Sequence, residues 1–245
     1  MRIVSLCPSL TETVFRLGRG GELVGRTKFC VQPSGTVEAV ERVGGTKNPK
    51  IERIVALAPD VVLMNEEENR REDADALRAA GLRVAASLPR DVAGAIALVR
   101  ELGTVLDATE RARTLADAIA ARAEAVASQA ACRAPVPFAY LIWREPLMAV
   151  APGTYVDALL TLAGGRNVVA AGDNRYPEIA ADTLAGAARI LLSSEPFPFA
   201  EKHRAELAAA TALPIERFVL VDGELLSWHG ARTLEGLDYA ARALT

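Results

Sequence analysis

The chain has 245 residues, 51% of them hydrophobic, which is enough to bury one large core or two modest ones. Its 28 basic and 31 acidic residues leave a net charge of −3 without a long block of like charge, so we expect no nucleic-acid partner. Apolar runs such as residues 61–64 fall well short of the roughly 18 to 20 residues that cross a bilayer, so we expect no transmembrane segment.

The N-terminus and the cysteines say little about location. Residues 2–6, Arg-Ile-Val-Ser-Leu, indicate a strand and not a secretory leader, so we expect the folded domain to begin at residue 1. Cys7, Cys30 and Cys132 form no CxxC pair, which predicts neither a disulfide framework nor a zinc site. A cytoplasmic protein fits these features, and so does a mature exported domain whose leader has been removed.

In the first third of the chain, short β-branched runs alternate with amphipathic helical patterns, which is typical of a parallel α/β sheet. Asn48 is predicted to cap a helix that has Pro49 at its first position and an apolar stripe through residue 57. The predicted elements, in chain order, are a strand at 3–6, a helix at 10–17, a strand at 23–24, a helix up to 57, a strand at 61–64, a helix at 72–80 and a strand at 82–86.

The segment from residue 91 to about residue 130 is rich in alanine and keeps a helical apolar period throughout. Asp107 and Glu110 stand at the spacing of a capping box, which predicts a break near residue 107. The helix after it is predicted to run for about 22 residues, or roughly 33 Å at 1.5 Å per residue.

After Pro135 the α/β alternation resumes. We therefore predict an α/β fold of two Rossmann-like lobes with small parallel sheets, joined by a single long rigid α-helix. The predicted domains are an N-terminal lobe at 1–90, a helical segment with the connecting helix at 91–131, and a C-terminal lobe at 132–245. The last lobe contains predicted strands at 138–142, 190–192 and 218–221 and predicted helices at 155–162, 182–187 and 233–244.

Several motifs of enzymes and cofactor sites are absent. No GxGxxG follows the first strand, which argues against a dinucleotide site, and neither GxSxG nor HExxH occurs. We interpret residues 44–47, Gly-Gly-Thr-Lys, as a turn and not as a phosphate-binding loop. His203 lies in a charged helical pattern and is predicted to face solvent. We expect no cofactor, no bound metal ion and no catalytic residue.

Three stretches resemble a known family: residues 2–12, 51–63 and 155–168. They are similar to the helical-backbone substrate-binding proteins that serve cobalamin, haem and siderophore importers, and most of all to the cobalamin-binding members. The resemblance extends over nearly the whole chain. It implies two α/β lobes joined by one stiff helix, with the ligand in the cleft between them and only a small closing motion.

Candidate ligand-binding residues lie in the segments that follow the predicted strands, because ligands of open α/β sheets bind beyond the carboxyl ends of the strands. These segments combine aromatic faces for a large flat ligand with cations that can hold amides, phosphate or carboxylates. The resemblance implies that Tyr176 and Trp228 match aromatic positions of the cobalamin-binding pattern, whereas Gln32 and Thr46 stand where aromatics are often found. The predicted ligand-binding residues are Lys28, Phe29, Gln32, Thr46, Lys47, Glu66, Asn69, Trp143, Arg144, Tyr176, Glu195, Trp228 and His229.

Alternatives remain for these residues. Each aromatic could pack in the core, and the charged run at 66–73 could be a solvated helix start, except at Glu66 and Asn69. A haem ligand would need Tyr176 or His229 as its axial ligand.

Glu52 and Asp182 match the acidic positions with which the family docks onto permease arginines. Each of these carboxylates could instead only complement a helix N-terminus, worth about 0.3 to 1 kcal/mol.

The resulting hypothesis is a monomeric substrate-binding protein that captures a corrinoid (cobalamin-like) or metal-chelate ligand and delivers it to an ABC import permease. The resemblance implies a periplasmic or other extracytoplasmic location. The alternative is a cytosolic corrinoid-handling protein or enzyme on the same scaffold, with Glu66, Glu195 and His229 as acid–base groups.

Overall fold

The computed structural model describes residues 1–245 and divides them into two compact units. The first unit comprises residues 1–89, 94–118 and 229–232, and the second comprises residues 90–93, 119–228 and 233–245. The chain therefore returns to the first unit near its C-terminal end. None of the helices is both long enough and apolar enough to span a bilayer.

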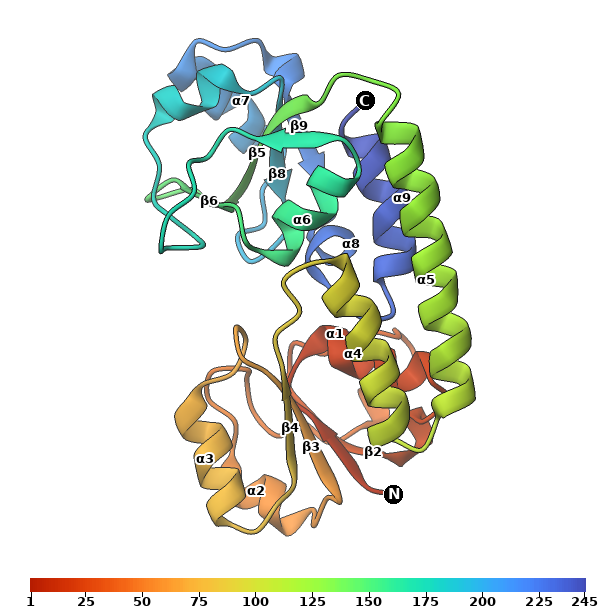
Figure 1. The fold of residues 1–245 in the computed structure, drawn as a ribbon. Coiled ribbons are helices and arrows are strands. Elements are labelled where there is room, and N and C mark those ends of the chain that lie inside the picture. Colours follow the sequence, from red (N-terminus) through yellow and green to blue (C-terminus); the bar gives the residue numbers. More distant parts are fainter. The chain divides into compact units, whose positions relative to one another are not determined.

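The first unit is built on a four-stranded parallel sheet with the order β2-β1-β3-β4. Figure 1 shows helices on both of its faces, with α2 and α3 on one and α1 and α4 on the other. One core cluster packs Ile54 and Leu77 of α2 and α3 against Val4 and Met64 of the sheet. The strands are β1 (Ile3–Ser5), β2 (Leu23–Arg26), β3 (Val61–Asn65) and β4 (Val84–Ser87); the helices are α1 (Pro8–Arg16), η1 (Gly20–Glu22), η2 (Val37–Ala39), α2 (Ile51–Ala56), α3 (Arg71–Ala79) and α4 (Val92–Val105).

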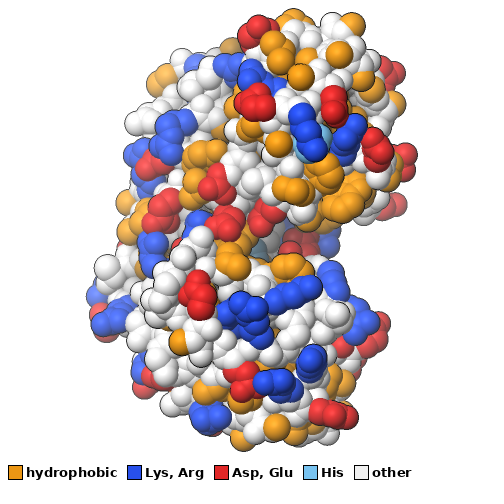
Figure 2. All heavy atoms as spheres, turned by 180° about the vertical axis from the view of Figure 1, so that it is seen from behind, with side chains coloured by type: hydrophobic (Ala, Val, Ile, Leu, Met, Phe, Trp, Pro, Cys, Tyr) orange, Lys and Arg blue, Asp and Glu red, His pale blue; other side chains and the backbone are white.

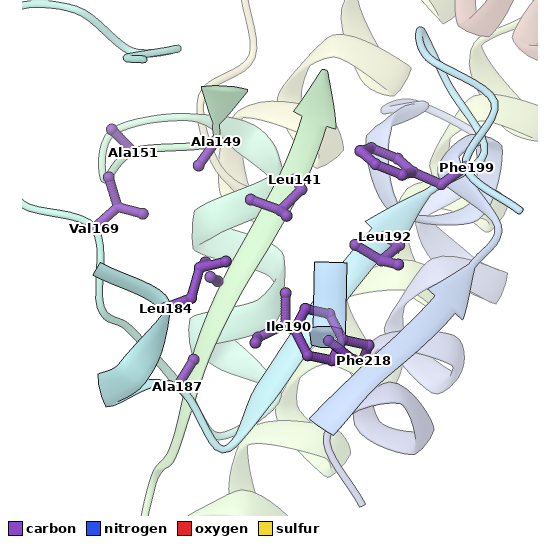
Figure 3. Close-up of a cluster of buried hydrophobic side chains, with 12 residues drawn as sticks. Leu141, Ala149, Ala151, Val169, Leu184, Ala187, Ile190, Leu192, Phe199 and Phe218 are labelled. Carbon is purple, nitrogen blue, oxygen red and sulfur yellow. The ribbon is translucent and has the colours of Figure 1, made fainter. Parts of the chain in front are cut away.

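The second unit has a five-stranded sheet, in which β6-β5-β8-β9 are neighbours in that order and β7 also pairs with β5. In its buried cluster, Leu141, Ile190 and Phe218 come from three different strands of the sheet (Figure 3). The strands are β5 (Val136–Trp143), β6 (Met148–Ala149), β7 (Gly165–Asn167), β8 (Arg189–Ser193) and β9 (Phe218–Val221); the helices are α6 (Tyr155–Leu162), η3 (Ala181–Gly186), α7 (Glu201–Thr211), η4 (Ile215–Arg217), α8 (Gly223–Ser227) and α9 (Thr233–Ala243).

The long helix expected after residue 107 is present as α5, which runs from Thr109 to Ala130 over 22 residues. Asp107 breaks the preceding helix with a φ of 52°, in the left-handed region that few residues with a side chain adopt. Glu110 forms an ion pair with Arg113 in the first turn of α5. Residues 109–118 of α5 belong to the first unit and residues 119–130 to the second.

Some local predictions differ from the structure. Asn48 does not cap α2, which begins at Ile51 after Lys50; instead, Asn48 closes a turn by accepting the N–H of Gly45. The second sheet is not wholly parallel, because β6 folds back antiparallel onto β5. The helix predicted at 182–187 is the 3₁₀ helix η3. These features depend on turn geometry and tertiary contacts that helical periodicity does not encode.

Candidate ligand-binding site

The loop after β2 exposes an aromatic ring beside a cation. Phe29 is 49% exposed, and the Lys28 ammonium lies 4.8 Å from the centre of its ring. Arg26 anchors the loop: its buried guanidinium donates to the carbonyls of Val37 (2.7 Å) and Cys30 (3.0 Å). Because these bonds fix the loop at both ends, Phe29 is presented on an ordered backbone. Gln32 follows in the same loop, half-buried, and precedes a cis proline.

Asn69 connects the ends of β1 and β3 to the turn at residues 44–49. It is 5% exposed, and its amide nitrogen donates to the carbonyls of Leu6 and Thr46, both at 3.0 Å. Its side-chain oxygen accepts the backbone N–H of Asn65 at 2.8 Å. The hydrogen bonds of Asn69 therefore go to the protein backbone, and its role here is to hold the loops.

The other candidates around Asn69 differ in exposure. Thr46 is buried, at 7% exposed, whereas Glu66 is exposed. The Lys47 ammonium contacts the carbonyl of Glu67, which links the 44–49 turn to the loop after β3. The structure thus brings Thr46, Lys47 and Asn69 together, with Glu66 in the same loop.

His229 also belongs to the first unit, although it lies near the C-terminus. It is 6% exposed, and its Nε2 lies 3.1 Å from the side-chain nitrogen of Asn65. Burial lowers the pKa of His229 to about 4, so the ring is neutral at neutral pH. Nε2 is therefore engaged with an amide donor, which disfavours its use as an axial metal ligand.

In the second unit, Glu195 and Trp228 are in direct contact. One carboxylate oxygen of Glu195, Oε1, accepts from the indole nitrogen of Trp228 at 2.9 Å and from the Ser227 hydroxyl at 2.6 Å. Trp228 is only 6% exposed. A Cβ on Gly223 would lie 2.5 Å from Cγ of Glu195, so only glycine fits at the start of α8. The carboxylate fixes the orientation of the indole.

A cluster of aromatic rings forms beyond the ends of β5 and β8. Trp143 is 40% exposed and meets the edge of Phe197 at 5.6 Å between ring centres. Phe197 in turn packs on Phe199 at 4.8 Å and on His203 at 5.1 Å. Arg144, next to Trp143, forms an ion pair with Glu206 at 2.9 Å. Trp143 is one of the predicted ligand-binding residues, and Phe197 supports its ring.

The prediction that His203 faces solvent is wrong. The residue is 6% exposed, and its Nδ1 accepts the backbone N–H of Ala200 at 3.0 Å at the start of α7. An imidazole can cap a helix start and pack on aromatic rings at the same time, and these contacts place it inside.

Three predicted residues remain: Tyr176 and the two proposed docking carboxylates. Tyr176 is half-buried in the loop after β7, where its backbone N–H donates to the side chain of Asn174 at 3.0 Å. Glu52 is exposed in the first turn of α2, and Asp182 is exposed in the first turn of η3.

No group of three or more histidine, cysteine or acidic side chains is arranged to hold a metal ion. Cys7 and Cys30 are buried free thiols, and burial raises the pKa of Cys7 to about 12. Basic and acidic side chains are interspersed on the visible face of each unit (Figure 2).

Two open recesses occur elsewhere and contain none of the predicted ligand-binding residues. One, of about 480 Å³, lies in the first unit between the end of α1 and the start of α5. The other, of about 420 Å³, lies in the second unit between α5 and α9. The lining of each includes four charged side chains and no aromatic ring.

Comparison with known proteins decides the family. Residues 3–192 match the family model described as periplasmic binding protein, which is most of the chain. The chain belongs to the periplasmic binding protein family. Members of this family are substrate-binding proteins of ABC import systems and not enzymes, and the resemblance drawn from the sequence is confirmed.

Relatives of this periplasmic binding protein include two vitamin B12-binding proteins. The one from Vibrio campbellii is 25% identical over 183 residues, which cover 75% of this chain and 66% of that protein. The one from Vibrio cholerae is 24% identical over 240 residues, which cover 97% of this chain and 86% of that protein.

Solved structures show the same fold. The periplasmic vitamin B12 binding protein of Vibrio cholerae has a TM-score of 0.84 at 23% identity, covering 99% of this chain and 96% of that one. The periplasmic heme-binding protein of Roseiflexus sp. RS-1 has a TM-score of 0.85 at 24% identity, covering 100% of this chain and 99% of that one. The predicted α/β fold class is confirmed.

Proposed function

We propose that this binding protein captures a corrinoid, and as the second candidate a haem or other metal chelate, and delivers it to an ABC import permease. The observation that carries the proposal is the exposure of two large rings, one in the loop after β2 and one at the end of β5. Phe29 is 49% exposed in the first unit and Trp143 is 40% exposed in the second. Each has a cation next to it in the chain, Lys28 and Arg144. Flat macrocycles with polar substituents suit such a combination.

The proposed ligand-binding residues fall into two groups. Those that are exposed or half-buried contact the ligand: Lys28, Phe29, Gln32, Lys47, Glu66, Trp143, Arg144, Tyr176 and Glu195. Those that are buried support the contacting residues from inside the protein: Thr46, Asn69, Trp228 and His229. This division assigns direct contact to side chains that solvent, and hence a ligand, can reach.

If the ligand is haem, Tyr176 is the axial ligand in this proposal. The Nε2 atom of His229 is engaged with Asn65, whereas Tyr176 is half-buried in a surface loop. A phenolate can serve as an axial ligand of haem iron.

The proposed organisation follows the family. Residues 1–90 and 132–245 act as the ligand-binding lobes, and residues 91–131 connect them. The protein works as a monomer outside the cytoplasm and has no nucleic-acid partner. Its relatives are named as periplasmic or vitamin B12-binding proteins, which supports this location.

Tryptophan fluorescence tests the ligand proposal, because both tryptophans of the chain lie in the second unit, Trp143 at the end of β5 and Trp228 directly after α8. Cyanocobalamin is expected to quench the emission and to bind less tightly to Trp143→Ala. Ile215→Ala is the matched control, since Ile215 has the same 40% exposure and lies in η4. Equal affinity of the Trp143 variant, the control and the wild type would contradict direct contact with Trp143.

Docking through Glu52 and Asp182 is tested by transport with a cognate permease. The double variant Glu52→Lys, Asp182→Lys is expected to abolish uptake while ligand affinity stays unchanged. Uptake at the wild-type rate would refute the docking role.

A further inference from the structure

Asn65, the last residue of β3, uses all the hydrogen-bonding capacity of its side chain. It is 2% exposed. Its oxygen accepts the backbone N–H groups of Glu67 (3.0 Å) and Glu68 (3.2 Å). Its nitrogen lies 3.0 Å from the carbonyl of Ser87 and 3.1 Å from Nε2 of His229. One buried amide thus joins the loop after β3, the end of β4 and a histidine 164 residues away in the chain.

These contacts fix the proton on the imidazole. The carbonyl of Ser87 only accepts, and the N–H groups of Glu67 and Glu68 only donate, so the amide cannot be flipped. Both hydrogens of the amide nitrogen are then used, one on Ser87 and one on His229. His229 must accept at Nε2 and carry its proton on Nδ1.

The segment around His229 is fastened to the first unit by two further contacts. Arg232 forms a bidentate ion pair with Glu12, with bonds of 2.6 and 3.0 Å. The backbone N–H of Ala231 donates to the Thr13 hydroxyl at 3.0 Å. Gly230 has a φ of 87°, and a Cβ there would lie 2.6 Å from the same hydroxyl, so the approach requires glycine.

We propose that Asn65 is a positioning residue for ligand binding, which joins the 66–69 loop and the 229–232 segment into one binding surface of the first unit. The inference rests on the proposed function, because both elements carry candidate ligand-binding residues. Asn65 acts through them and does not touch the ligand.

The first test measures the tautomer of His229 and amide hydrogen exchange in the ligand-free protein by nuclear magnetic resonance. Wild-type His229 is expected to show the Nδ1–H tautomer, with its signal assigned by its loss in His229→Gln. In Asn65→Asp the new carboxylate faces Nε2, so the ring is expected to take up a proton there. In Asn65→Ala the amides of Glu67 and Glu68 are expected to lose their protection against hydrogen exchange. Unchanged protection and an unchanged tautomer in Asn65→Ala would overturn the proposal.

The second test measures affinity for cyanocobalamin and haemin by calorimetry. For the probe that the wild type binds, Asn65→Ala is expected to lower the affinity by about tenfold or more, because a buried side chain with four hydrogen bonds is lost. Tyr155→Phe is the control: it removes the buried bond of 2.9 Å to Thr233, which lies within the second unit, and should leave affinity unchanged. Wild-type affinity in Asn65→Ala would also overturn the proposal.

The two tests separate the possible failures. If the wild type binds neither probe, the ligand assignment fails, and the exchange protection of Glu67 and Glu68 still decides the role of Asn65. Asn65→Asp retains the oxygen that accepts from these amides and changes both contacts of the amide nitrogen, to Ser87 and to His229, so it separates the two halves of the Asn65 side chain.

Discussion

Acidification from pH 6.5 to pH 4 is expected to cost the protein about 3 kcal/mol of stability through His229 alone. Burial lowers the pKa of His229 in the folded state from 6.5 to about 4. Each unit of pKa difference corresponds to about 1.4 kcal/mol. Between the two values the unfolded chain binds the proton and the folded chain does not, so stability falls as the pH falls.

The measurement is a series of urea unfolding curves between pH 7 and pH 4 for the wild type and for His229→Gln. Glutamine can still accept from Asn65 but does not titrate, so the two proteins share every other ionisable group. Their difference in the free energy of unfolding isolates His229 and is expected to shrink by about 3 kcal/mol across this range. A difference that is constant with pH would refute the reasoning that the ring is buried and neutral.

Three further predictions test other parts of the structure. Glu12→Gln breaks the largely buried ion pair with Arg232 and is expected to lower the free energy of unfolding by about 3 kcal/mol. Asp117→Asn breaks the exposed ion pair with Arg100 and should cost less than about 1 kcal/mol. The urea midpoints of the two variants compare these costs. Arg26→Met removes the donor from loop carbonyls and should cost about 2 kcal/mol or more; an unchanged midpoint would rule out its anchoring role. Glu195→Gln weakens the hydrogen bond to the indole of Trp228 and should cost about 1 kcal/mol of stability. It should also shift the maximum of the tryptophan emission, and an unshifted emission spectrum would contradict that contact.

The elements that the sequence predicts well are those with a strong local signal. The helix after residue 107 has an unbroken apolar period and appears as α5 over 22 residues. The buried strand at 61–64 appears as β3, one residue longer. By contrast, β6 has two residues and depends on the turn that folds it back onto β5. No periodicity can be read from so short a strand.

The candidate site was predictable as a set of loops but not as a set of contacts. The rule that ligands bind beyond strand ends selected Trp143, and the same rule would have selected Asn65, the polar last residue of an apolar strand. Trp228 was expected to offer a face to the ligand, but it is only 6% exposed and donates to the carboxylate of Glu195, 33 residues earlier. Such long-range pairs have no signature in one sequence.

The central claim is tested most directly by calorimetric titration of the wild type with cyanocobalamin, and with cobinamide, haem and a ferric siderophore for comparison. The account predicts one-to-one binding of a corrinoid with a dissociation constant of about 1 μM or tighter, about −8 kcal/mol. Binding of haem or the siderophore alone would move the assignment to the second candidate. Absence of binding to all four would contradict the proposed ligand class.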